Sequence, residues 1–176
     1  SIPIPTRSWH WCAVSARRTA CAAPCLTIGA MVAQVLYNFS GAPAVTQPSS
    51  FSDVTSDQWF ANAIAWAQQN GIMNGYPDNR FGANDPITRQ DFAVVLYHYS
   101  SQQQLDTSVH ANLSQYRDVS SVSSYAQDAM QWAVASKIIS GKSSTQLAPK
   151  DSATRAECAQ ILKNYLTGVA SSLLGS

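Results

Sequence analysis

The sequence has little charge of either sign and no face rich in basic residues. Charged residues make up 12% of its 176 positions, and the formal net charge is +1. A protein that binds nucleic acid needs clustered Lys and Arg to neutralise phosphates, so this composition argues against a nucleic-acid partner. Hydrophobic residues make up 45% of the chain, which is therefore long and apolar enough to bury a core in one domain.

Long apolar runs are also missing. The longest candidate, residues 30–36 with their flanks, is interrupted by Gln34 and Asn38. A membrane-spanning helix needs about 18 or more consecutive apolar residues, so we expect no transmembrane span. No complete signal peptide is visible, because Arg17 and Arg18 do not lead into an uninterrupted apolar segment.

Cysteine is scarce and unevenly placed. Cys12, Cys21 and Cys25 crowd the N-terminal region, where a disulfide among them stays open, while Cys158 stands alone in a helical pattern. No C-x-x-C pair occurs, so zinc and thioredoxin-like redox sites are not indicated. The histidines are isolated and no carboxylate pair has a fixed spacing, so we expect no catalytic residue, no cofactor and no enzyme activity.

One short pattern is present twice. Thr88 and Thr154 are each followed three positions later by an acid, Asp91 or Glu157, and then by an apolar helical run. This pattern is typical of a capping box, in which the hydroxyl accepts from a free N–H of the first turn and the acid reaches back to the cap. We therefore predict that helices begin at both places.

Each capping Thr is followed directly by an arginine, Arg89 or Arg155. A cation is disfavoured in the first turn of a helix by the helix dipole, so its double occurrence needs an explanation. One hypothesis is that the guanidinium groups bind an anionic ligand. The other is that they form ion pairs within the protein, for which the candidate acids are Asp53, Asp85, Asp118 and Asp151.

The surrounding sequence repeats with a steady spacing, which is typical of an internal repeat. Trp66 and Trp132 lie 66 residues apart, as do Thr88 and Thr154. Because the large residue recurs at a fixed helical site, we expect both tryptophans in the core and not on a sugar-binding surface. Each unit is predicted to be a helix pair. The first helix of one unit carries Trp59, Phe60, Ala63, Ile64 and Ala67 on one face. The first helix of the next unit carries Tyr125, Ala129, Met130 and Ala133 on the corresponding face. The second helices carry Phe92, Val95, Leu96 and Tyr99, and Cys158, Ile161, Leu162 and Tyr165.

A half unit precedes the two full ones. In residues 30–39, Met31, Val35, Leu36 and Phe39 fall on one helical face, and the segment aligns with the second helices at an offset of 60. Ile28 and Gly29 then stand where Thr88 and Arg89 stand, so this unit lacks both the cap and the arginine. The predicted organisation is an atypical, poorly ordered tail (1–25), half a unit (26–43), a linker (44–50), a full unit (51–101), a linker (102–115), a full unit (116–168) and a tail (169–176).

The ordered set of short motifs in residues 51–100 resembles the S-layer homology (SLH) motif, and residues 116–168 resemble it more weakly. The residues that carry the likeness are Phe51-Ser52-Asp53-Val54, Trp59, Ala67, Gly71-Ile72, Gly75-Tyr76-Pro77-Asp78, Phe81, Pro86-Ile87-Thr88-Arg89 and Phe92. The resemblance implies an all-α fold of helix–loop–helix motifs in a pseudo-threefold arrangement, here with an incomplete first motif.

The same resemblance implies a function. SLH modules hold exported bacterial proteins at the cell wall by binding secondary cell-wall polysaccharide, often with a pyruvylated sugar. It implies a secreted, cell-surface location and a cell-wall polysaccharide as partner. The candidate ligand-binding residues are Arg89, Arg155, Trp59, Gly75, Tyr76, Asp78 and Gly141. A guanidinium can bind a pyruvyl carboxylate through two hydrogen bonds, and aromatic rings can pack against sugar C–H faces.

Two questions stay open from the sequence. The alternative function is a helical-repeat scaffold that binds other proteins and no glycan. The incomplete first motif leaves the oligomeric state open between a monomer and a dimer in which a second copy covers the missing faces.

Overall fold

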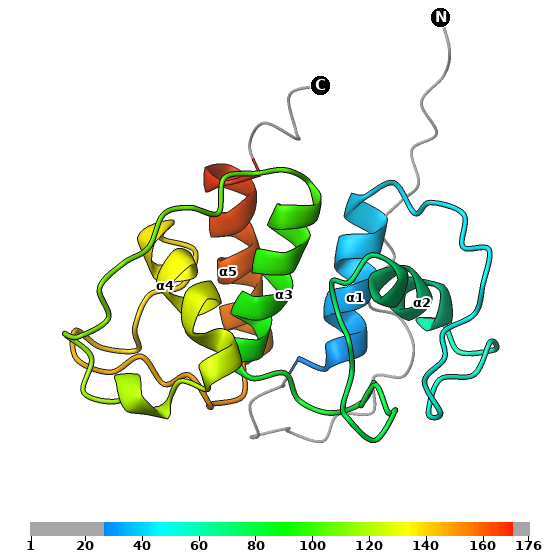
Figure 1. The fold of residues 1–176 in the computed structure, drawn as a ribbon, viewed down its shortest axis with the longest axis horizontal. Helices are drawn as coiled ribbons and strands as arrows, with labels where there is room; N and C mark the ends of the chain where they lie inside the picture. Colours follow the sequence, from blue (N-terminus) through cyan, green and yellow to red (C-terminus); the bar gives the residue numbers. More distant parts are fainter. Residues whose placement is uncertain (1–26, 171–176) are drawn as a thin grey trace, which may run out of the picture.

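The computed structural model describes residues 27–170, and the structural statements below concern that part of the chain. Its helices are α1 (Gly29–Phe39), α2 (Ala61–Gln69), α3 (Arg89–Gln102), α4 (Gln127–Ala135) and α5 (Arg155–Gly168), with short 3-10 turns η1 (Val119–Ser121) and η2 (Ser124–Ala126) before α4 (Figure 1). Isolated bridges, but no strands, occur between residues 27 and 170, so the predicted all-α class is confirmed. The tail predicted over residues 1–25 and the cysteines Cys12, Cys21 and Cys25 lie outside the described residues.

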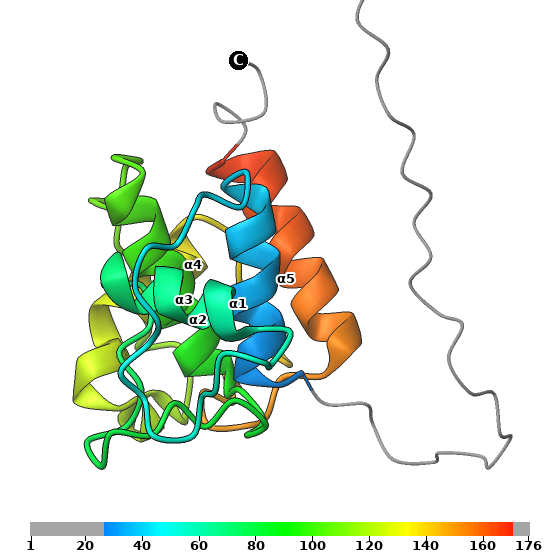
Figure 2. The ribbon, with the colours of Figure 1, turned by 90° about the vertical axis from the view of Figure 1, so that its right-hand side faces the viewer.

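The three long helices α1, α3 and α5 stand side by side, as the two views of the ribbon agree (Figures 1 and 2). Tyr99 lies between them: its ring centroid is 6.4 Å from that of Phe39 and 6.3 Å from that of Tyr165. The Tyr165 hydroxyl is hydrogen-bonded to that of Ser100 at 3.0 Å, and burial raises the pKa of Tyr165 to about 12. The apolar faces of the second helices therefore form a shared core.

Each short helix packs against the long helix of the preceding unit. Helix α2 packs on α1 and α4 packs on α3. The ring of Trp66 lies 5.7 Å from that of Tyr37, and the ring of Trp132 lies 5.5 Å from that of Tyr97. Both tryptophans are buried, as their recurrence at one helical position predicted. Since no unit covers its own apolar face, the units stabilise one another.

A closed cycle of backbone hydrogen bonds joins the starts of the three long helices. The N–H of Thr27 donates to the carbonyl oxygen of Ala153 (3.1 Å), that of Ala153 to Ile87 (2.8 Å), and that of Ile87 to Thr27 (2.9 Å). Each of these residues lies just before a long helix, so the half unit contributes to the cycle from the same structural position as the full units. The cycle supports the pseudo-threefold arrangement, which stays a prediction.

Three expected core positions are exposed instead. Val35 is 44% exposed, because α1 turns Ala33, Leu36 and Tyr37 toward its neighbours. Trp59 and Tyr125 are 57% and 63% exposed, since they lie before the first residues of α2 and α4 and do not join the buried faces of those helices. The predicted faces of the second helices are correct apart from Leu162, which is only partly buried.

Candidate functional site

Thr88 and Thr154 are the N-caps of α3 and α5. Each hydroxyl accepts from the N–H of the acid three residues on, at 3.2 Å. Glu157 also reaches back, and its Oε2 accepts from the N–H of Thr154 at 2.9 Å, which completes the capping box. The carboxylate of Asp91 accepts from the Thr88 hydroxyl at 2.6 Å instead. The box is complete only around the longer Glu side chain.

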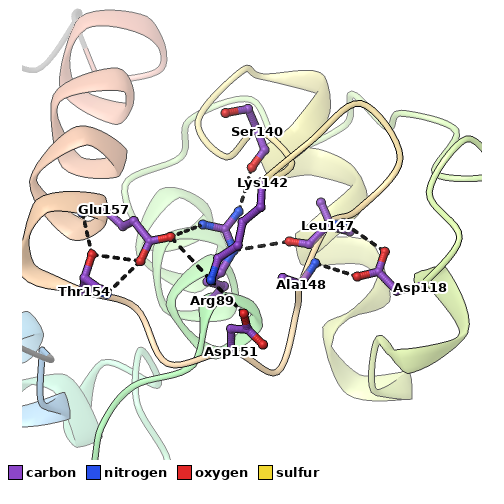
Figure 3. Close-up of polar contacts among 9 residues, drawn as sticks. All are labelled: Arg89, Asp118, Ser140, Lys142, Leu147, Ala148, Asp151, Thr154 and Glu157. Atoms are coloured by element: carbon purple, nitrogen blue, oxygen red, sulfur yellow. Dashed lines mark hydrogen bonds and ion pairs between the residues drawn. The ribbon is translucent and has the colours of Figure 1, made fainter. Parts of the chain in front are cut away.

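Arg89 lies at the junction between the second and third units, and its side chain is 5% exposed (Figure 3). Nη1 donates to Oε1 of Glu157 at 3.2 Å, Nη2 to the carbonyl oxygen of Ser140 at 2.6 Å, and Nε to that of Leu147 at 3.3 Å. All three nitrogens therefore have acceptors in the third unit. The internal partner is Glu157, an acid outside the four that the sequence suggested.

A small ionic network surrounds this guanidinium. Nζ of Lys142 lies 2.7 Å from a carboxylate oxygen of Asp151 and 4.0 Å from one of Glu157 (Figure 3). Burial alone would raise the pKa of Glu157, but hydrogen bonds from Thr154 and the charges of Arg89 and Lys142 lower it. The junction therefore keeps Glu157 ionised and paired.

The junction between the first and second units has the same backbone but a glycine in place of the arginine. The N–H of Gly29 donates to the carbonyl oxygen of Asp85 at 3.2 Å, just as that of Arg89 donates to Asp151 at 3.0 Å. A Cβ added at Gly29 would lie 3.6 Å from the ring of Phe81, which is ordinary van der Waals contact. The space that the guanidinium occupies at one junction is therefore not filled by residue 29 at the other.

A groove of about 530 Å³ lies at this glycine junction. Tyr76 from the loop of the second unit and Tyr125 from the third unit line it, with Gly29, Asp85 and Asp91. The tyrosines are 46% and 63% exposed, so both offer surface to a ligand. We name this cavity the glycine groove.

The phenols and carboxylates of the glycine groove interact with one another. The Tyr125 hydroxyl donates to Oδ1 of Asp91 at 2.7 Å and accepts from Nε2 of Gln90 at 3.0 Å. Burial, together with Asp91, raises the pKa of Tyr125; burial, together with Asp85 and Asp91, raises that of Tyr76. Both phenols therefore stay protonated at neutral pH and can donate hydrogen bonds.

A second groove, of about 270 Å³, lies between α1 and α5. It brings together two of the predicted ligand-binding residues, Arg155 and Trp59, with the apolar side chains of Val35 and Leu162. Arg155 is exposed here, in contrast to Arg89. In α1 the position that corresponds to Asp91 is occupied by Met31, which also lines this groove. We name it the arginine groove.

The remaining predicted residues shape loops. Asp78 forms an exposed ion pair with Nε of Arg80 at 2.7 Å and does not line the glycine groove. Gly75 lines that groove at φ +67°, where a Cβ would lie 2.5 Å from the Phe51 ring. At Gly141 a Cβ would lie 2.5 Å from the carbonyl oxygen of Ser143. Both positions require glycine for tight internal packing.

Asp53 and Asp118 have a role that the sequence reasoning missed. Asp118 accepts from the N–H groups of Leu147 (2.9 Å) and Ala148 (2.7 Å), and Asp53 accepts from the corresponding N–H groups of the second unit at 2.7 and 2.8 Å. Each carboxylate thus fastens the loop that leads to a long helix. The signal was available, because the two acids recur at matching places in the repeat.

Other chemistry is not indicated by the described residues. Between residues 27 and 170, no three His, Cys, Asp or Glu side chains are grouped to hold a metal ion. In the same part of the chain, no helix combines the length and the apolar character needed to cross a membrane. Cys158 is buried, and burial raises the pKa of its thiol, so it is not an activated nucleophile.

Comparison with known families agrees with this architecture. The model of the S-layer homology domain matches residues 50–93 and 115–159, which cover most of the two predicted full units but end before their last residues. The chain belongs to the S-layer homology family. The half unit around α1 lies outside both matched regions.

Similar proteins include both enzymes and surface proteins. An amylopullulanase of Thermoanaerobacterium thermosulfurigenes is 34% identical over 122 residues, covering 69% of this chain and 6% of the relative. A surface-layer 125 kDa protein of Lysinibacillus sphaericus is 29% identical, covering 68% of this chain and 10% of the relative. A cellulosome-anchoring protein of Acetivibrio thermocellus is 27% identical, covering 66% and 26%. The chain thus spans only a small part of each relative. A similar segment occurs in proteins whose names indicate different activities.

Proposed function

We propose that this SLH chain holds a secreted protein at the bacterial cell wall by binding wall polysaccharide, without catalysing a reaction. The related surface-layer and cellulosome-anchoring proteins support a surface location. The chemical activities of the related enzymes belong to those larger proteins, of which this chain covers a small part. The shared element therefore fits attachment better than turnover.

The observation that carries the proposal is that Trp59 and Arg155 line one groove. The indole offers an apolar ring to the C–H face of a sugar, and the guanidinium offers paired donors to a carboxylate. A pyruvylated sugar has both an apolar C–H face and a carboxylate. The α1 position that corresponds to the acids Asp91 and Glu157 is Met31, so α1 brings no carboxylate to this place in the groove.

The experiment measures retention of the full chain on insoluble, pyruvylated wall polysaccharide, before and after mild acid removes the pyruvyl ketals. Arg155→Ala should weaken retention on the native polymer about tenfold or more, since a hydrogen-bonded charge pair contributes about 1.5–3 kcal/mol. The same variant should behave like the wild type on the depyruvylated polymer. Arg117→Ala removes an exposed arginine that lines neither groove and serves as the matched control.

Equal retention of wild type and Arg155→Ala on the native polymer would show that the arginine groove does not bind the carboxylate. Failure of the wild type on both polymers would exclude glycan anchoring and favour the protein-binding scaffold. Circular dichroism of each variant separates lost binding from lost folding. Trp59→Ala should also weaken retention, and it should leave the core intact because the indole is largely exposed.

A further inference from the structure

The two junctions present corresponding acceptors to different side chains. At the Arg89 junction, the guanidinium satisfies the carbonyl oxygens of Ser140 and Leu147 and the carboxylate of Glu157. The repeat spacing places the counterparts of these acceptors at Asn74, Phe81 and Asp91. All three counterparts line the glycine groove.

Two of these counterpart acceptors lack a donor like the one that Arg89 supplies at the junction between the second and third units. Within residues 27–170, no hydrogen bond reaches the carbonyl oxygens of Asn74 or Phe81. The third, Asp91, accepts from the hydroxyls of Thr88 and Tyr125. The wall of the groove is therefore rich in acceptors, and a ligand that seats there must bring donors.

The charge around the glycine groove is unfavourable to an anion. Asp85 and Asp91 line it, no Lys or Arg is among the described residues that do so, and Arg80 is paired with Asp78 outside the lining. The guanidinium carbon of Arg80 lies 5.6 Å from the ring centroid of Tyr76 at the rim. A carboxylate-bearing sugar placed between Asp85 and Asp91 would be repelled, because like charges in a partly buried site interact strongly.

We infer that Gly29 makes the glycine groove a second saccharide site, selective for uncharged sugar units. Sugar hydroxyls supply the donors that the carbonyl oxygens of Asn74 and Phe81 lack, while Tyr76 and Tyr125 offer rings to the sugar faces. The inference rests on the proposed function, since it assigns a neutral part of the same polymer to a groove other than that of Arg155. The two grooves would then bind different units of one glycan, which raises the overall affinity.

The structure supplies its own test, because Arg89 shows what an arginine does at this position. Gly29→Arg should place a guanidinium against Asn74, Phe81 and Asp91 and fill the groove. Gly29→Ala is the matched control: the methyl group would meet the Phe81 ring at an ordinary 3.6 Å and leave the cavity open. The probe is the depyruvylated wall polysaccharide, which carries no ketal carboxylate.

Gly29→Arg should lose about tenfold or more of the retention on the depyruvylated polymer. Gly29→Ala and Arg155→Ala should stay within about twofold of the wild type there. Retention of Gly29→Arg at the wild-type level would overturn the inference. So would a wild type that binds the native polymer but not the depyruvylated one, an outcome that leaves the proposed function standing.

A second variant covers the case in which Gly29→Arg does not fold. Tyr76→Ala removes a half-exposed ring from the wall of the glycine groove, and Tyr76 does not line the arginine groove. It should reduce retention on both polymers by the same factor, because the neutral units are present in both. No loss on either polymer would also contradict the inference. Loss of wild-type binding to both polymers would instead overturn the proposed function.

Discussion

The Arg89 junction and the Gly29 junction have corresponding backbone hydrogen bonds, but a buried side chain fills the first and a groove lies at the second. At the first, a buried guanidinium joins two repeat units through three acceptors (Figure 3). At the second, glycine leaves a groove of about 530 Å³ between two tyrosines. One side chain therefore decides whether a junction of this repeat is a structural contact or a cavity.

The comparison also separates the two arginines that share one sequence pattern. Arg89 and Arg155 both follow a capping Thr, yet the first is buried and the second is exposed beside Trp59. The difference lies in the unit that each arginine faces. Arg89 points into the complete loop of the third unit, whereas Arg155 lies beside α1, the second helix of the half unit.

The largest effect is expected from breaking the buried contact. Arg89→Met should lower the free energy of unfolding by about 3 kcal/mol or more, because it leaves Glu157 and two carbonyl oxygens without their charged donor. Urea denaturation monitored by circular dichroism measures this change. Arg117→Met, at an exposed position, should change the free energy by less than about 0.5 kcal/mol.

If Arg89→Met has no greater effect than Arg117→Met, the buried contact does not stabilise the junction. Such a result would remove the contrast with Gly29. The arginine would then be available to a ligand, as the other sequence hypothesis held.

The caps give a smaller and finer comparison. Thr154→Ala should cost about 1–2 kcal/mol of stability, and Thr88→Ala about 1 kcal/mol, because only Thr154 belongs to a complete capping box. Equilibrium unfolding of both variants in one buffer measures the difference. A more costly Thr88→Ala would show that the Thr88–Asp91 contact beside the glycine groove matters more than the box.

Much of the fold was predictable because it depends on periodic apolar residues. The spacing of 66 residues located both full units, and Trp66 and Trp132 were correctly placed in the core. The pattern failed at Trp59 and Tyr125, which look like the first turns of amphipathic helices. Their exposure depends on where the helices begin, and local periodicity does not fix that boundary.

The site was harder to predict than the fold. The sequence drew attention to Arg89, but its partner Glu157 is 68 residues away, and two of its three acceptors are backbone carbonyls. Backbone acceptors have no signature in the sequence. The sequence predicted two residues that line the glycine groove, Gly75 and Tyr76, but not the role of Gly29. The groove lies where Gly29 lacks a side chain, and only the geometry of the neighbouring junction shows this.

The smallest expected effect concerns pH and tests whether the ionic contacts differ between the junctions. Burial alone would raise the pKa of Glu157, but the hydrogen bonds from Thr154 and the charges of Arg89 and Lys142 outweigh it and lower this pKa. Burial would likewise raise the pKa of Asp53, but hydrogen bonds from the N–H groups of Phe81 and Gly82 lower it. A carboxyl whose pKa is lower in the folded than in the unfolded state stabilises the protein above the unfolded value of about 4. That stability is lost as the pH falls through the folded pKa.

The free energy of unfolding should therefore decrease as the pH is lowered below about 4.5. Glu157→Gln and Asp53→Asn should each make this decrease shallower. In an Arg89→Met background, Glu157→Gln should change the slope less than in the wild type, because Arg89 contributes to the lowered pKa of Glu157. Asp53→Asn should change the slope equally in both backgrounds, since Asp53 interacts with the loop beside the glycine groove and Arg89 is not among the causes of its shift. Equal behaviour of the two acids would mean that the Arg89–Glu157 contact adds nothing to the capping hydrogen bonds that Glu157 accepts.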